Sequence, residues 1–144
     1  MVSIVILLFT QVSCSYTTYL FIVNHREEPV HIIYTSGKYE NYLALLSHPE
    51  LSSAKRFSKV NPDRFSPMDA GAFAVDEGTG RVSVTVAGQS AVKIGNSRAR
   101  EHPKEIASAV LTIRTSGGTV EYRAGEAFRA FDHEKLGIGV LRLR

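Results

Sequence analysis

Residues 73–84 read FAVDEGTGRVSV, two short runs in which apolar and polar residues alternate on either side of a glycine-rich turn. If Gly78 and Thr79 form the turn, residues of matching character face each other across the two runs: Val75 with Val82, Phe73 with Val84, and Asp76 with Arg81. A shift by one residue would destroy both the apolar and the charged pairs. These residues therefore predict a β-hairpin with one buried face.

Residues 111–124 repeat this arrangement around Gly117 and Gly118. With these two glycines as the turn, the facing pairs are again matched in character: Ile113 with Tyr122, Leu111 with Ala124, Arg114 with Glu121, and Thr112 with Arg123. The sequence thus predicts a second hairpin of the same kind.

The rest of the chain adds short β-branched or aromatic runs separated by turn residues. The run at 17–24 is apolar on both faces and is expected to be a central strand. Further strands are predicted at 30–35, 91–94, 126–131 and 138–143. The spacing of Tyr39, Tyr42, Leu43 and Leu46 predicts a helical segment within 39–57. The expected fold is mostly β, an antiparallel β-sandwich or jelly-roll-like barrel with a short helical insertion.

The first 25 residues contain no Lys, Arg, Asp or Glu, and they open with an apolar run at 2–9. Small and polar residues follow, among them the single cysteine of the chain, Cys14. This order is typical of a secretory signal peptide that is cleaved after Cys14 or Ser15. We therefore expect residues 1–15 to be a signal peptide and residues 16–144 to be a single β-sandwich domain. A membrane-spanning helix and a buried first strand are the alternatives.

The amino-acid composition excludes several kinds of catalytic and metal site from the chain that would remain after cleavage. The 144 residues are 44% apolar and 22% charged, as in an ordinary globular domain. Without Cys14 the chain can form neither a disulfide nor a cysteine-ligated zinc site, and it cannot use thiol catalysis. His25 and His31 flank a turn, but no third ligand accompanies them. We expect neither a metal nor another cofactor.

One set of residues has the composition of a catalytic site. Glu121 and Arg123 share a strand face, and His133 follows the next predicted strand. A carboxylate base, an arginine for phosphate and a histidine acid are the groups that RNA cleavage by acid–base catalysis requires. In residue types the set resembles the sites of small secreted microbial ribonucleases, which would imply a ribonuclease-like activity. The alternative is structural: Glu121 pairs with Arg114, and His133 lies in an exposed turn at 132–135.

Arginine accumulates toward the C-terminal end of the sequence. Residues 98–144 hold nine Lys or Arg, seven of them Arg, against six Asp or Glu. Four of these arginines lie on predicted strands: Arg114, Arg123, Arg142 and Arg144. If the last strand joins the sheet of the second hairpin, they form one basic stripe that would bind an acidic protein. Nucleic acids and glycans are the other ligands left open, the latter because six tyrosines could contact sugars.

These features favour a small secreted, non-enzymatic protein that binds another macromolecule, with a protein as the preferred partner. A signal-like N-terminus and a body without thiols or Asn-x-Ser/Thr sites resemble the profile of effectors from plant-pathogenic fungi. That resemblance implies secretion, delivery into a host cell and a part in virulence. The alternative functions are a ribonuclease-like enzyme and a carbohydrate-binding module. No stable membrane insertion is expected after removal of residues 1–15.

Overall fold

A computed structural model describes residues 17–39, 43–52, 60–97, 110–123, 130–135 and 137–144. One sheet contains β1 (Thr18–Asn24), β3 (Gly37–Tyr39), β4 (Leu43–Ser52), β5 (Ser66–Pro67), β8 (Ser90–Ser97), β11 (Asp132–Lys135) and β12 (Ile138–Leu143). The other contains β2 (Val30–Thr35), β6 (Phe73–Asp76), β7 (Arg81–Val86), β9 (Val110–Thr115) and β10 (Gly118–Arg123). A 3₁₀ turn, η1 (Pro62–Arg64), precedes β5. Among the described residues, no helix has the length and apolar character needed to span a membrane.

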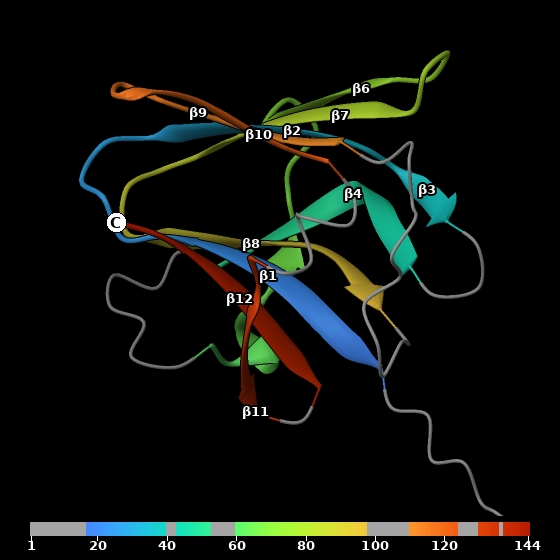
Figure 1. The fold of residues 1–144 in the computed structure, drawn as a ribbon. Coiled ribbons are helices and arrows are strands. Elements are labelled where there is room, and N and C mark those ends of the chain that lie inside the picture. Colours follow the sequence, from blue (N-terminus) through green and yellow to red (C-terminus); the bar gives the residue numbers. More distant parts are fainter. Residues whose placement is uncertain (1–16, 40–42, 53–59, 98–109, 124–129, 136) are drawn as a thin grey trace, which may run out of the picture.

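The two sheets lie face to face, so the expected β-sandwich is confirmed (Figure 1). The seven-stranded sheet has the order β11-β12-β1-β8-β4-β3, with β5 paired to β4. The five-stranded sheet has the order β10-β9-β2-β7-β6. Neighbouring strands are antiparallel except β1 and β12, which run parallel. The chain therefore crosses repeatedly from one sheet to the other.

The hairpin predicted at 73–84 is confirmed with its register. Val75 lies opposite Val82, Phe73 opposite Val84, and Asp76 opposite Arg81. The Asp76 carboxylate closes the loop, because it accepts hydrogen bonds from the Gly78 amide at 3.0 Å and the Thr79 hydroxyl at 2.8 Å. Those hydrogen bonds, from Thr79 first, lower the pKa of Asp76 below its usual value.

The second hairpin forms, but its predicted register is wrong by two residues. The turn lies at Ser116 and Gly117, so that Gly118 pairs with Thr115. The Thr115 hydroxyl fixes this turn, since it accepts from the Gly117 amide at 3.2 Å and donates to the Gly118 carbonyl at 3.3 Å. Arg114 consequently lies opposite Thr119, and Glu121 lies opposite Thr112 rather than Arg114. A two-residue shift leaves every side chain on its predicted face.

The helical segment expected within 39–57 is wrong where the structure describes it. Residues 43–52 form β4, which pairs with β8, while residues 40–42 and 53–57 lie outside the described residues. Leu43 and Leu45 point into the core in strand alternation, and an irregularity between Leu45 and Glu50 then shifts the register. Leu46 directly follows Leu45 and is half-buried, so residues 43–46 show no strict alternation in the sequence, and the spacing of Leu43 and Leu46 fits a helix as well.

Most of the remaining strand predictions fall on strands. The segments at 17–24 and 138–143 correspond to β1 and β12, 30–35 is β2, and 91–94 lies within β8. The strand predicted at 126–131 falls almost wholly outside the described residues. Residues 132–135, expected to form a turn, are strand β11 and pair with β12.

Apolar side chains pack in two layers, one on each side of the seven-stranded sheet. The larger layer lies between the sheets and includes Leu20, Ile22, Ile32, Tyr34, Val84 and Ile113. The smaller layer lies on the outer side, where Val60 and Phe65 cover Phe21, Val23, Ala91, Ile138 and Val140. Strand β1 contributes to both layers, which explains why its sequence is apolar on both faces, as predicted for a central strand.

Two turns that cross between the sheets are bound to each other at one end of the sandwich. The fully buried Asn24 amide donates to the carbonyls of Glu28 at 2.8 Å, Val86 at 3.2 Å and Ala87 at 3.1 Å. Its side-chain oxygen accepts the Arg26 amide at 3.0 Å. We call this contact between the β1–β2 and β7–β8 turns the turn junction; it consists of Asn24, residues 25–28 and residues 86–89.

Candidate functional site

The outer side of the five-stranded sheet carries mostly polar side chains. We call this surface the polar face; its residues include His31, Ser83, Thr85, Thr112, Arg114, Thr119, Glu121 and Arg123. They alternate along their strands with the side chains that enter the core. Thr119, Arg114, His31 and Thr85 lie side by side in one row across four strands. Figure 1 shows this sheet as an outer layer of the sandwich.

His31 lies between two hydroxyl groups on the polar face. Its Nε2 is 3.0 Å from the Ser83 hydroxyl and its Nδ1 is 3.2 Å from the Thr85 hydroxyl. A neutral imidazole satisfies both contacts by accepting at one nitrogen and donating at the other. A catalytic Ser–His pair also needs a group that orients and stabilises the charged imidazole, usually a carboxylate, and here that position is held by a hydroxyl. The arrangement therefore orients the His31 ring by hydrogen bonds to two hydroxyl groups.

The structure does not bring the three candidate catalytic residues together. Glu121 and Arg123 lie on β10, and their side chains point away from the core because Tyr122, between them, packs against it. His133 lies on β11 in the seven-stranded sheet. The two sheets of a sandwich pack about 10 Å apart, and the polar face is directed away from the sheet that holds His133. Sequence alternation predicted the shared face of Glu121 and Arg123, but not that residues 132–135 form a strand of the other sheet.

The four candidate binding arginines divide between the two sheets. Arg114 and Arg123 are exposed on the polar face. Arg142 lies on β12 in the seven-stranded sheet and Arg144 directly follows that strand, so the expectation of a single basic stripe in one sheet is wrong. The reason is the strand order, in which β12 pairs with β1 and β11 rather than with the second hairpin.

Arg142 is held in a half-buried ion pair with Glu134. The other oxygen of the same carboxylate, Glu134 Oε2, accepts the backbone N–H of Val60 at 3.2 Å. The pair therefore connects the sheet to the segment that covers its outer apolar layer. Arg144 lies nearby at the surface, and its carbonyl accepts from Arg26 Nη1 at 3.3 Å. Burial, followed by the positive charges of Arg142 and Arg144, lowers the pKa of His25 below its usual value.

Replacement of Arg142 by alanine tests this structural role. We expect the free energy of unfolding to fall by about 2 kcal/mol, because Glu134 keeps its half-buried charge without its partner. Alanine at the exposed Arg144 serves as the control and should change stability by less than about 0.5 kcal/mol. Both values come from urea unfolding followed by circular dichroism. Equal stabilities of the two variants would contradict the assignment.

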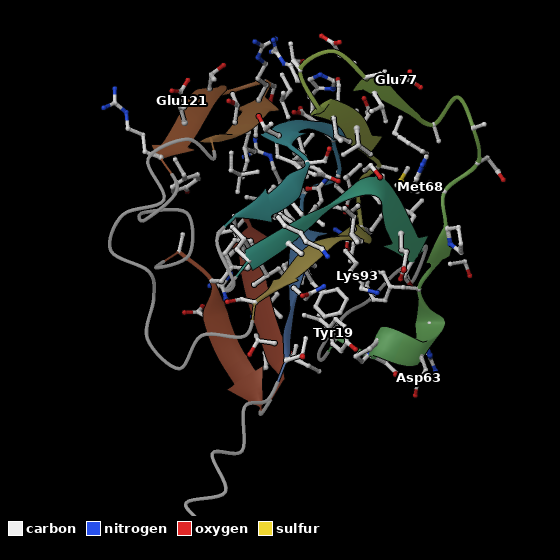
Figure 2. The ribbon with its side chains drawn as sticks, turned by 90° about the vertical axis from the view of Figure 1, so that its right-hand side faces the viewer. Tyr19, Asp63, Met68, Glu77, Lys93 and Glu121 are labelled. Atoms are coloured by element: carbon white, nitrogen blue, oxygen red, sulfur yellow. The ribbon has the colours of Figure 1, made fainter. Side chains whose placement is uncertain are left out.

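Two further features lie away from the polar face. A surface depression of about 450 Å³ is lined by residues of β4, β5 and their surroundings, among them Ser52, Arg64, Met68 and Asp69. On the outer side of the seven-stranded sheet, Lys93 Nζ lies 5.0 Å from the centre of the Tyr19 ring and 2.9 Å from Glu50 (Figure 2). Tyr19 is the tyrosine most open to a ligand there, with 39% of its surface exposed.

Tyr34 and Tyr122, in contrast, contribute to the core. Tyr34 is buried and donates its hydroxyl to the Leu46 carbonyl at 2.7 Å, which ties β2 to β4 across the sandwich. Tyr122 is half-buried against the same core. The side chains of Tyr16, Tyr39 and Tyr42 lie outside the described residues. The tyrosines therefore do not form one continuous surface for sugars among the residues that the structure describes.

Within the described ranges, no three His, Asp or Glu side chains are grouped closely enough to hold a metal ion. Comparisons with protein-family models, with curated protein sequences and with solved structures found no match. Of the candidate residues, Arg114, Glu121 and Arg123 lie together on the polar face. Sequence reasoning missed the contacts of His31 with Ser83 and Thr85, although the alternation of β2 and β7 placed all three on outward positions.

Proposed function

We propose that this protein is a non-enzymatic binding protein whose polar face contacts an acidic region of a partner protein. The observation that carries the proposal is the exposure of Arg114 and Arg123 on the same sheet face, next to the hydroxyl groups of Thr112 and Thr119. Arginine pairs bidentately with carboxylates and stacks on planar groups, which suits it to protein interfaces. His31 and its hydroxyl neighbours add hydrogen-bonding groups beside Arg114.

The outer sides of the two sheets support this choice of surface. On the seven-stranded sheet, Val60 and Phe65 cover the apolar part of the outer side, and the Phe21 and Phe65 rings lie 4.7 Å apart. On the five-stranded sheet, Arg114, Thr85 and Glu121 are exposed. A partner that approaches the polar face therefore displaces water rather than part of the protein itself.

Binding of poly-L-glutamate, measured by isothermal titration calorimetry, tests the charge preference of the polar face. We expect the wild-type protein to bind this probe more weakly as salt rises, since exposed charge pairs are screened. Replacement of Arg114 and Arg123 by glutamate should weaken binding about tenfold or more, which corresponds to about 1.4 kcal/mol. The matched control is Arg64→Glu with Arg144→Glu, which changes the net charge equally away from the polar face. An equal loss in both double variants would overturn the proposal.

Secretion is the second part of the proposed function, and it rests on the composition of residues 1–15. The secreted protein acts as an effector on a host, where a chain without thiols is insensitive to a reducing cytosol. Expression in a eukaryotic secretory host should yield a product whose N-terminal sequence begins at Ser15 or Tyr16. Recovery of Met1 on soluble, folded protein from the medium would contradict the cleavage.

A further inference from the structure

Strand β10 forms one edge of the five-stranded sheet, and its exposed side has the features of a pairing surface. Among the described residues β10 pairs with β9 alone. Five of its six residues are exposed and Tyr122 is half-buried. Val120 is 51% exposed although it lies on the core side of the strand. Figure 2 shows Glu121 on the outermost part of this hairpin.

The other edges of the sandwich carry features that discourage pairing, whereas β10 does not. Natural proteins protect edges with short strands, lysine, proline and bulges. In the described residues β3 has three residues and includes Lys38, β5 contains Pro67, β6 has only four residues, and β11 has an irregular register. Strand β10 has six residues in unbroken register with β9 and contains neither lysine nor proline.

The backbone of β10 offers hydrogen-bonding groups at alternate residues. Thr115 and Gly118 close a two-residue turn and therefore form a hydrogen-bonded pair. The pairs that follow alternate, so Thr119, Glu121 and Arg123 direct their backbone N–H and C=O groups away from β9. These three residues form the free edge to which another strand can be added.

We propose that β10 pairs antiparallel with β10 of a second copy, so that two molecules share one continuous sheet. The side chains decide the register. With Glu121 opposite the second copy's Arg123, a two-fold axis makes this ion pair twice and places Tyr122 opposite the second copy's Tyr122. Glu121 and Arg123 are both hydrogen-bonding positions of the free edge, as that register requires. A strand with charges of one sign would repel its own copy; β10 is instead complementary to itself.

The association is expected to be weak. In this register the described parts of the two strands face each other over residues 121–123, which bury much less surface than the roughly 1,600 Å² of a standard stable interface, so a dissociation constant on the order of 100 μM is reasonable. Sedimentation velocity over a concentration series measures it. We expect a concentration-dependent shift from monomer to dimer. A wild-type protein that stays monomeric up to about 500 μM would overturn the proposal, including the case in which β10 accepts only a strand of a different protein.

Charge reversal tests the register without relying on the wild-type affinity. Glu121→Arg places arginine opposite arginine, and Arg123→Glu places glutamate opposite glutamate, so each variant should dimerise at least tenfold more weakly. The exchanged variant, E121R with R123E, restores both ion pairs and should dimerise like the wild type. An equimolar mixture of the two single variants should also associate, because each then faces the opposite charge.

Arg114→Glu is the matched control, since Arg114 lies on the same face but on the inner strand β9. It should leave dimerisation unchanged while it weakens binding of poly-L-glutamate, so that this proposal and the proposed function can fail separately. Failure of the mixture or of the exchanged variant to associate, with each variant folded by circular dichroism, would overturn the pairing of Glu121 with Arg123.

Discussion

Replacement of Asn24 by alanine is expected to lower the free energy of unfolding by about 3 kcal/mol. Asn24 is completely buried, and the two hydrogens of its amide are shared among three backbone carbonyls from two turns. Alanine leaves these acceptors without their donor, and each unsatisfied buried group costs about 1–3 kcal/mol. The hydrogen bonds to the Glu28 and Ala87 carbonyls are only partly buried. The expected loss is therefore smaller than three times the cost of a fully buried unsatisfied group.

Urea unfolding followed by fluorescence or circular dichroism measures this effect. Asn61→Ala is the matched control, since Asn61 is exposed and caps η1 through a single hydrogen bond of 3.1 Å to the Asp63 amide. It should cost about 1 kcal/mol or less. Asn24→Asp keeps the acceptor for the Arg26 amide but loses the donors, so it should resemble alanine or be worse. A stable Asn24→Asp variant would show that the donated hydrogen bonds are unimportant.

Replacement of Gly88 by alanine should destabilise the same turn junction by about 3 kcal/mol or more. A Cβ atom at this position would lie 2.1 Å from the Glu27 carbonyl oxygen and 2.6 Å from its carbon. Both atoms belong to the backbone of the facing turn, so no side-chain rotation can relieve the overlap. The two turns would have to separate, and the hydrogen bond from the Gln89 amide to the Arg26 carbonyl, 3.1 Å long, would be strained with them.

Gly117→Ala provides the comparison, because a Cβ atom there would meet nothing closer than the Thr115 hydroxyl at 3.7 Å. It should change stability by less than about 0.5 kcal/mol. Thermal unfolding distinguishes the two variants, with the Gly88 variant melting far lower or failing to accumulate as folded protein. Similar melting temperatures would mean that the two turns are not in close contact.

The sequence predicted the strand register correctly in the hairpin where the residue pairs on both faces fit only one register. In the β6–β7 hairpin, the apolar pairs and the pair of Asp76 with Arg81 agree in one register, and the Asp76 carboxylate fixes the loop. In the β9–β10 hairpin, the residues that face each other after a two-residue shift are also compatible, so the sequence fits both registers. The observed register has the turn in which the Thr115 hydroxyl hydrogen-bonds to Gly117 and Gly118. A helix was predicted in place of strand β4 because the half-buried Leu46 directly follows Leu45 and obscures the alternation of Leu43 and Leu45.

The candidate site shows a different limit. Alternation correctly assigned Arg114, Glu121 and Arg123 to an outward face, since that depends only on local geometry. The position of β12 depends on long-range pairing with β1, which no local pattern encodes, and it separates Arg142 and Arg144 from the other arginines. The ion pair of Arg142 with Glu134 could have been suggested only once β11 and β12 were known to be neighbours.

The parallel pairing of β1 with β12 has a consequence for synthesis on the ribosome. Tyr19 pairs with Ile138, and the other neighbour of β1 is β8, at residues 90–97. Strand β1, the first of the described strands, can pair with β8 once residues 90–97 have emerged, but it can pair with β12 only when nearly all of the described chain has been translated. Contacts so distant in sequence slow folding and leave apolar strands such as β1 exposed to chaperones or to other nascent chains. The sandwich is therefore completed only after β12 has left the exit tunnel.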